Sequence, residues 1–294
     1  MTPDLPLRLG YGTNGFHSHR LVDALAVIAG LGYDGVALTL DHLHLDPFAP
    51  DLPARTAACR RRLDELGLAI VIETGARYVL DPWVKHHPTL VSPSGASRRV
   101  DYLHRAVEVA ADLGAEAVSF WSGTLDPGTG RDVAWSRLTD GVARVLDLAE
   151  RREVTLAVEP EPGHFLERLD DVLELRDRMG DPTRLRVTLD IGHVVCNETR
   201  DIADTIKAAG DLIANVQVDD MVPGVHEHLE LGTGDVDFVA AIVALQEVGY
   251  EGLASVELPR QSHAAPAVAE QSLTFLRRAA RAAADPFQQK ERVP

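Results

Sequence analysis

Four oxygen-bearing side chains stand at or near the ends of short apolar runs in the second half of the chain. They are Glu159 in AVEPEPGHF, Asp190 in VTLDIGHVV, Gln217 in NVQVDDM and Glu257 in ASVELPR. A carboxylate that ends a buried apolar strand is costly in free energy unless it is paired or binds a metal. Any one of these acids alone fits a salt bridge or an exposed loop, whereas four equivalent positions in succession favour one shared site.

Two histidines form a second group that could do chemistry. His226 and His228 lie two residues apart in GVHEH. Residues i and i+2 of an extended segment point the same way, so both rings can reach one centre. Arg260 and His263 follow Glu257 closely and are expected at the rim of the same site. They could anchor a substrate carboxylate or phosphate, or belong to a solvated loop.

The elements that must position these residues alternate regularly. Apolar runs of strand length and longer segments with helical spacing follow each other eight times. The expected strands are 7–11, 35–40, 68–73, 116–121, 154–159, 186–190, 213–218 and 253–257. The expected helices are 19–31, 52–66, 98–114, 133–152, 166–179, 200–210, 236–248 and 264–283, and several end at a glycine, namely Gly32, Gly67, Gly114 and Gly249.

Eight strands separated by eight helices predict a parallel sheet, because each parallel crossover needs a helix. The predicted fold class is therefore α/β, a single-domain (β/α)8 TIM barrel over residues 1–284. The polar residues 285–294 are expected to form a flexible tail. An open doubly wound sheet is the structural alternative, but no Gly-x-Gly-x-x-Gly loop follows an early strand.

The C-terminal ends of the strands of such a barrel converge on one cavity. Glu159, Asp190, Gln217 and Glu257 are therefore expected to meet there, and three adjacent carboxylates repel one another unless a divalent cation lies between them. The connection 74–96 is longer than an ordinary link between a strand and a helix and carries aromatic and basic side chains. We expect it to close over the cavity as a lid.

Composition limits the partners. The 294 residues include 45 acidic and 29 basic side chains, and the net charge of −16 disfavours binding to nucleic acid. The two cysteines, Cys59 and Cys196, give no disulfide framework and suit a reducing, cytoplasmic location. The first residues lack a secretory signal pattern, and no apolar run reaches membrane-spanning length. The expected partner is a small-molecule substrate, with no membrane and with a homo-oligomer left open.

The chain resembles the xylose isomerase-like barrels, a superfamily that includes sugar epimerases, hydroxypyruvate isomerases, inosose dehydratases and one class of apurinic endonucleases. The motifs that carry the resemblance are V-E-P at 158–160, L-D-x-G-H at 189–193, V-Q-V-D-D at 216–220, H-L-E-L-G-T-G-D-V-D-F at 228–238 and S-V-E-L at 255–258. In this order and spacing they are specific to the superfamily, but they do not fix the substrate.

The resemblance implies that Glu159, Asp190, Gln217 and Glu257 are the metal ligands. Many members have His where Gln217 stands, and a Gln at this position resembles the hydroxypyruvate isomerase branch. The resulting set of oxygen donors suits Mn²⁺ or Mg²⁺ best, with Co²⁺, Zn²⁺ and Fe²⁺ as further options.

By the same resemblance, His193, on the loop that leaves its strand, contacts substrate or a further metal. In the endonuclease branch the positions of His193, His226 and His228 hold an additional zinc. Substrate contact and a second metal therefore both stay open for this trio.

The function implied by the resemblance is a divalent-metal-dependent isomerase or epimerase of a small sugar or another polyhydroxylated carbonyl compound. It would act by proton transfer through an enediolate, with Glu159 and Glu257 as the acid–base pair. One alternative is a dehydratase that expels a β-hydroxyl from the same intermediate. Another is a metal-dependent hydrolase of the endonuclease branch, although the histidines that branch carries after its third and fourth strands have no counterpart here. A ligand-binding barrel without activity is disfavoured by the complete ligand set.

Overall fold

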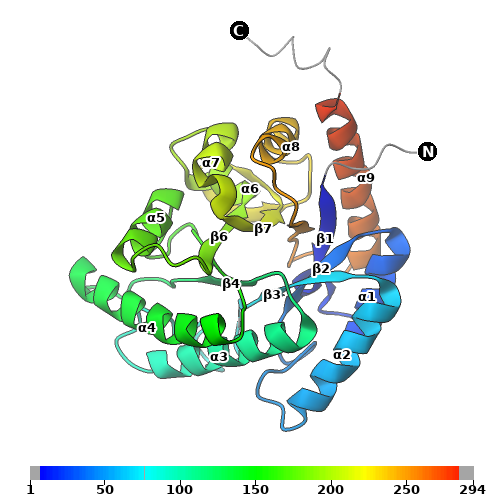
Figure 1. Cartoon of the computed structure of the whole chain (residues 1–294). Helices are drawn as coiled ribbons and strands as arrows, with labels where there is room; N and C mark the ends of the chain where they lie inside the picture. The colour runs from blue at the N-terminus through cyan, green and yellow to red at the C-terminus, as the bar shows by residue number, and fades with distance from the viewer. Residues whose placement is uncertain (1–6, 76, 285–294) are drawn as a thin grey trace.

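The computed structural model describes residues 7–75 and 77–284 of the chain. Its centre is a closed barrel of eight parallel strands, ordered β1-β10-β7-β6-β5-β4-β3-β2 around the ring (Figure 1). The strands are β1 (Arg8–Gly12), β2 (Gly35–Thr39), β3 (Ala69–Glu73), β4 (Val118–Trp121), β5 (Leu156–Glu159), β6 (Leu185–Asp190), β7 (Ile213–Val218) and β10 (Leu253–Val256). Closure of the ring confirms the predicted barrel and excludes the open sheet.

Helices occupy the connections between the strands and form the outer layer (Figure 1). They are α1 (Leu21–Leu31), α2 (Leu52–Leu66), α3 (Ala96–Leu113), α4 (Arg131–Arg151), α5 (Leu169–Arg178), α7 (Ile202–Ala209), α8 (Phe238–Glu247) and α9 (Ala265–Ala283). The first three end at Gly32, Gly67 and Gly114, whose positive φ angles are favourable for glycine alone. Each predicted strand and helix corresponds to one of these elements, with boundaries that differ by a few residues.

The periodicity did not predict five short elements, and all of them except η2, which precedes β7, follow the C-terminal ends of the strands. They are the 3₁₀ turns η1 (Thr13–Phe16) and η2 (Gly210–Leu212), the short helix α6 (Ile191–Asn197), and the antiparallel strands β8 (Asp220–Val222) and β9 (Val225–Leu229). The prediction that His193 lies on a loop is wrong, because it belongs to the first turn of α6. Oδ1 of Asp190 accepts the backbone N–H of His193 at 2.9 Å and so caps the helix directly at the end of β6.

The connection that follows the β8–β9 hairpin is held by one buried carboxylate. The oxygens of Asp220 accept the backbone N–H groups of Gly232, Gly234 and Val236 at 2.8–3.0 Å. A Cβ atom on Gly234 would lie 2.4 Å from Oδ1 of Asp220, so the close approach requires a glycine. The hydrogen bonds to Asp220 explain the glycine within the G-T-G-D-V sequence, and they hold the connection after β9 against β8.

The interior of the barrel changes from apolar to polar along its axis. Four residues form a small apolar cluster in it, namely Val71, Ala117, Ala157 and Leu253. Two positions further along the same four strands, and so on the same side of each strand, stand the polar residues Glu73, Ser119, Glu159 and Ser255. The cavity at the C-terminal end of the barrel therefore has a floor of polar side chains.

The described residues between β3 and α3 contain neither helix nor strand, as the length of the connection led us to expect. Arg99 of α3 is buried and donates to the carbonyl oxygens of Thr74, His86 and Pro88 at 3.2, 2.6 and 3.0 Å. Trp83, in contrast, is 90% exposed. The base of this connection is fixed to α3, and its tip projects into solvent.

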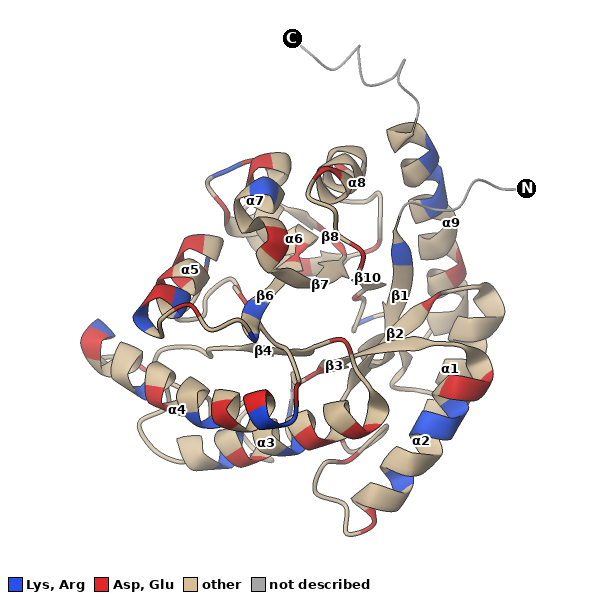
Figure 2. Cartoon of the chain, viewed as in Figure 1, with Lys and Arg blue, Asp and Glu red and all other residues tan. Residues whose placement is uncertain are grey.

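Acidic and basic residues alternate along the outer helices, as α2, α3 and α4 show in Figure 2. Many form ion pairs one helical turn apart, such as Arg60–Asp64 and Arg178–Glu174. Among the described residues, no helix has both the length and the apolar character that a membrane span needs. The predicted tail, residues 285–294, lies outside the described residues.

Candidate metal centre

The barrel brings the predicted carboxylates together. Glu159 ends β5, Asp190 ends β6 and Glu257 directly follows β10, and one oxygen from each lies within 4.8 Å of the others. Gln217 of β7 is in register with Asp190 on one side and with Ser255 of β10 on the other. The four side chains predicted from successive strand ends therefore surround one point of the cavity.

Two oxygens of this group are buried and have no hydrogen-bond partner among the described residues. They are Oδ2 of Asp190 and Oε1 of Gln217. A buried polar atom that lacks a partner costs about 1–3 kcal/mol. A divalent cation would satisfy both oxygens and reduce the repulsion between the carboxylates, so the residues present fit a metal that prefers oxygen ligands.

The pKa values describe the same electrostatic conflict. Burial raises the pKa of Glu159 well above its ordinary value, and Glu161 and Glu257 raise it further. Burial also raises the pKa of Glu257. Although burial raises the pKa of Asp190 too, the nearby His193 and His228 outweigh it and lower the value. In the absence of a cation, Glu159 and Glu257 hold protons more tightly than ordinary carboxyl groups do.

Both oxygens of Glu257 are held by amide side chains. Nδ2 of Asn14, in η1, donates to Oε1 at 2.7 Å, and Nε2 of Gln217 donates to Oε2. The sequence analysis missed Asn14. The one signal available was topological, because β1 must pair with the last strand to close the ring, which places η1 beside Glu257.

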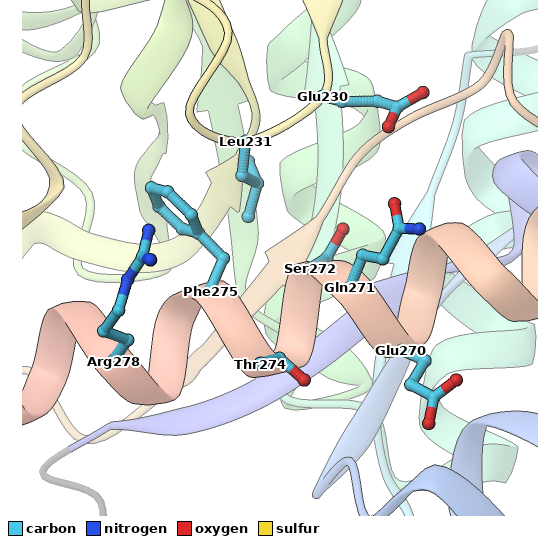
Figure 3. A pocket seen from close by; sticks show the side chains of 8 residues that line it. All are labelled: Glu230, Leu231, Glu270, Gln271, Ser272, Thr274, Phe275 and Arg278. Atoms are coloured by element: carbon cyan, nitrogen blue, oxygen red, sulfur yellow. The ribbon is translucent and has the colours of Figure 1, made fainter.

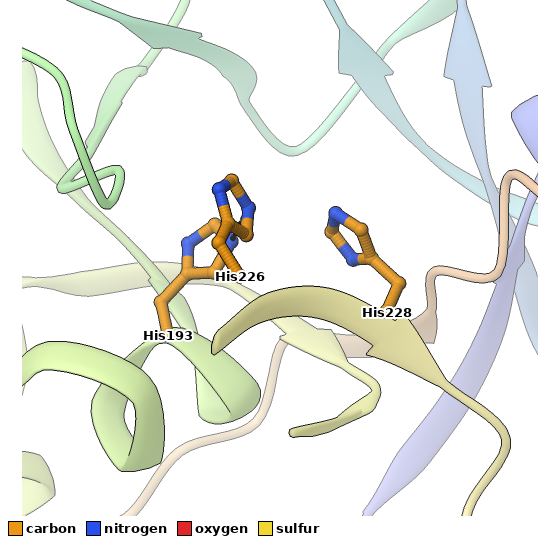
Figure 4. A group of neighbouring side chains, drawn as sticks. All are labelled: His193, His226 and His228. Atoms are coloured by element: carbon orange, nitrogen blue, oxygen red, sulfur yellow. Dashed lines mark hydrogen bonds between the residues drawn. The ribbon is translucent and has the colours of Figure 1, made fainter. Parts of the chain in front are cut away.

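The three histidines lie close together (Figure 4), and His193 and His228 adjoin carboxylates of the site. The Nε2 atoms of His193, on α6, and His226, on β9, are 3.1 Å apart. Nδ1 of His193 lies 3.5 Å from Oε1 of Glu159. Burial lowers the pKa of His193 to about 4, so its ring is neutral at pH 7. The expected extended backbone at His226 and His228 is confirmed by β9, and the histidines adjoin the predicted ligand set.

His228 differs from the other two because it pairs with a fully buried acid. Its Nδ1 contacts Oδ2 of Asp219. Burial alone would lower the pKa of His228, but the carboxylate of Asp219 raises it to about 10. Asp219, which directly follows β7, was not predicted, although it stands only two residues after Gln217.

Two further acids line the site. Glu161 lies 3.4 Å from Nε2 of His226, and burial raises its pKa to about 8. Glu73 ends β3 inside the barrel, where it accepts from Nδ2 of Asn215 at 3.3 Å. Burial raises the pKa of Glu73 well above its ordinary value, and Glu257 adds to the rise. The sequence analysis gave Glu73 no role, because a single carboxylate at a strand end carries no specific signal.

Arg260 and His263, which the sequence analysis expects at the rim of the site, lie in the segment between β10 and α9. Arg260 forms an ion pair with Glu227 of β9, and His263 is exposed. Within the described part of the chain, no hydrogen bond or ion pair joins either side chain to the four strand-end residues. Both residues are exposed.

A surface cavity of about 450 Å³ lies elsewhere, between α9 and the connection after β9 (Figure 3). Its lining includes Leu231, Glu270, Phe275 and Arg278. None of the predicted site residues contributes to it, so it is separate from the candidate metal centre.

Comparisons with known proteins agree with this fold. The family model of the xylose isomerase-like TIM barrel matches residues 25–279. L-ribulose-5-phosphate 3-epimerase UlaE of Salmonella paratyphi A is 26% identical over 255 residues, which cover 84% of each chain.

Solved structures show the same fold at lower identity. An L-ribulose 3-epimerase superposes with a TM-score of 0.78 at 21% identity, over 98% of this chain and all of the other. The 3-keto-D-glucoside 4-epimerase YcjR of E. coli gives a TM-score of 0.76 at 17% identity, over 92% and 99% of the two chains.

Proposed function

Because this chain belongs to the xylose isomerase-like TIM barrel family, we propose that it is a divalent-metal-dependent epimerase or isomerase of a small sugar or related polyhydroxylated carbonyl compound. One observation carries the proposal. Three carboxylates from three strand ends converge within 4.8 Å, and Oδ2 of Asp190 and Oε1 of Gln217 are buried without a hydrogen-bond partner in the described part of the chain. The similarity to an L-ribulose-5-phosphate 3-epimerase supports the same reaction class.

In this proposal Glu159, Asp190, Gln217 and Glu257 hold the metal. Their donors are all oxygens, which favours Mn²⁺ or Mg²⁺ over the softer ions. A divalent cation bound there would polarise a substrate carbonyl and acidify the adjacent C–H bond.

Glu159 and Glu257 are the proposed acid–base pair. Burial raises the pKa of both carboxyl groups, and an acid–base pair needs groups that can both accept and donate a proton. One takes the proton from the carbon next to the carbonyl, and the other returns a proton to a carbon of the resulting enediolate. Asn14 orients Glu257 by its hydrogen bond to Oε1.

His193, His226 and His228 are proposed to contact substrate hydroxyl groups. His228, held in its charged form by Asp219, can donate a hydrogen bond to a substrate oxygen on which negative charge develops. Arg260 and His263 are proposed to contact the far end of the substrate. The free thiols of Cys59 and Cys196 are in keeping with our proposal of a cytoplasmic, reducing location.

The test combines metal analysis with a substrate panel. Mass spectrometry of the purified protein should count one divalent metal per chain, and the metal-loaded protein should interconvert C3 epimers of a ketopentose or ketohexose. A count of two would assign the three histidines to a second metal. Release of a dehydrated product would make the protein a dehydratase, and absence of both metal and turnover would reject the proposal.

A further inference from the structure

Two histidines that the proposed function does not use pack against one tryptophan at the C-terminal end of the barrel. The ring of His86 stacks on Trp121, the last residue of β4, with centroids 5.2 Å apart and an interplanar angle of 14°. The ring of His164 meets the same tryptophan in a T-shaped arrangement, with centroids 4.9 Å apart. These three side chains, which we call the aromatic wall, come from the connection after β3, the end of β4 and the connection after β5.

The aromatic wall adjoins the candidate metal centre. Trp121 is in register with Glu159, the proposed ligand that ends β5. The backbone N–H of His164 donates to the carbonyl oxygen of Glu161 at 2.9 Å, and the side chain of Glu161 lines the site. The wall therefore borders the site on the side of β4 and β5.

Each histidine of the wall has a ring nitrogen that lacks a partner. Nε2 of His86 and Nδ1 of His164 are buried, and neither has a hydrogen-bond partner among residues 7–75 and 77–284. Burial lowers the pKa of both rings to about 3, so both are neutral at pH 7. A neutral imidazole has one N–H donor and one acceptor nitrogen. Buried polar atoms are rarely left without a partner in folded proteins, so both nitrogens call for a bound group.

His86 is held where it stands, although its backbone conformation is unfavourable. Its φ angle is +68°, in the left-handed region that few residues other than glycine adopt. Its N–H donates to the carbonyl oxygen of Arg77 at 2.6 Å, and its own carbonyl oxygen accepts from Nη2 of Arg99 at 2.6 Å. Backbone conformations of this kind persist where the surrounding contacts impose them, and they are concentrated at ligand-binding sites.

We propose that His86 and His164 bind hydroxyl groups of the substrate's carbon chain and so select a sugar that has a free hydroxyl there. A hydroxyl group both donates and accepts, so it can pair with either nitrogen of a neutral ring, whereas a phosphate or carboxylate oxygen only accepts. Because both nitrogens are shielded from solvent, the hydroxyl binds beneath the connection between β3 and α3. This inference rests on the proposed function and specifies how its substrate is recognised.

The test compares a ketohexose with analogues that each lack one hydroxyl group away from the reacting carbons, on the metal-loaded protein. The wild type should have a kcat/KM about 10- to 100-fold lower for one of these analogues, because a buried ring nitrogen then stays unpaired. His164→Phe and His86→Phe keep an aromatic ring against Trp121 and remove the nitrogens. Each should lower kcat/KM for the complete sugar by about 10-fold and leave that for the same analogue unchanged.

A second set of variants tests the position of the polar atom. The amide of Asn reaches about as far as Nδ1 of His, and the amide of Gln about as far as Nε2. His164→Asn and His86→Gln should therefore retain most of the discrimination between the two sugars, whereas His164→Gln and His86→Asn should lose it. These four variants also decide the question if a Phe variant does not fold.

His104→Phe is the matched control, because the ring of His104 contacts the carbonyl oxygen of Arg144 between the outer helices α3 and α4. It should leave the discrimination unchanged. An equal fall in kcat/KM for the complete sugar and every analogue in the His86 and His164 variants, with no difference between Asn and Gln, would overturn the inference and leave the proposed function intact.

If the wild type turns over no ketose, the proposed function fails and sugar binding measured by calorimetry decides the inference. Tighter binding of the complete sugar than of one analogue, lost in both Phe variants, would support the role of the two histidines. Equal binding of all the sugars, or no binding, would overturn it.

Discussion

Asn14 and Glu257 are joined by a hydrogen bond of 2.7 Å although 243 positions separate them in the chain. The bond links the turn after the first strand to the residue after the last. It also helps to keep the carboxylate of Glu257 ionised, because the donated hydrogen bond lowers a pKa that burial raises.

Asn14→Ala should therefore weaken catalysis more than metal binding. We expect kcat to fall by about 10- to 100-fold, the range for loss of a hydrogen bond to a charged group. The acidic limb of the pH profile of kcat should move to higher pH, because Glu257 then holds its proton more tightly. If kcat falls but the acidic limb of its pH profile does not move, Asn14 has a purely structural role.

Asp190→Ala should abolish stoichiometric metal binding. The substitution removes a predicted ligand and the cap of α6, and it leaves Glu159 and Glu257 without their cation. Metal content by mass spectrometry and activity should fall together. Asp64→Ala, which alters an exposed helix pair with Arg60, should change neither. Wild-type metal content in the Asp190 variant would remove this residue from the ligand set.

Glu257→Gln should keep the fold and part of the metal affinity, because the amide oxygen can still act as a ligand. Turnover should fall by several orders of magnitude, since a neutral amide cannot accept a proton. In deuterated water, the wild type should incorporate deuterium next to the carbonyl of the product, as NMR can detect. Label that stays on the substrate carbons, together with full activity of the variant, would indicate hydride transfer instead.

The metal-free protein should become less stable as the pH rises from about 6.5 to about 8. Below about 6.5 the buried neutral rings of His86, His164 and His193 oppose this trend, because they take up protons when the chain unfolds. Burial raises the pKa of Glu161 from 4.5 to about 8, so from about 6.5 to about 8 the folded chain holds a proton that the unfolded chain has lost. The contribution of such a group to stability is present below its unfolded pKa and disappears as the pH passes its folded pKa. Thermal unfolding of chelator-treated protein across this range provides the measurement, and a Tm that increases throughout would contradict it.

The tip of the connection between β3 and α3 should close over bound substrate. Arg99 fixes the base of this connection, whereas Trp83 is 90% exposed. Limited proteolysis should cut between residues 77 and 87 more slowly when a saturating sugar is present. Equal rates with and without sugar would show that the tip does not act as a lid.

The fold and the four strand-end residues could be predicted because local patterns determine them. Alternating apolar runs set the strands, and position at a strand end sets which side chains reach the cavity, as for Glu159 and Asp190. Asn14 and Asp219 could not be predicted in this way. Their roles depend on which loops meet above the barrel, and that follows from long-range packing rather than from periodicity. Periodicity did not predict the short helix α6 for a related reason, because the residue that caps this helix is assigned by periodicity to the preceding strand.

The pairing of β1 with β10 has a consequence for biogenesis. Glu257 comes from the last strand and Asn14 from the turn after the first, so the candidate metal centre lies across the seam at which the barrel closes. A ribosome adds on the order of 5–20 residues per second, and domains form in the order of synthesis. When β7 has emerged from the ribosome, the nascent chain carries three of the four proposed ligands. The seam between β1 and β10 has not yet formed. If the proposed ligands hold a metal, its acquisition is therefore a late event in the maturation of this protein, and it marks the completion of the ring.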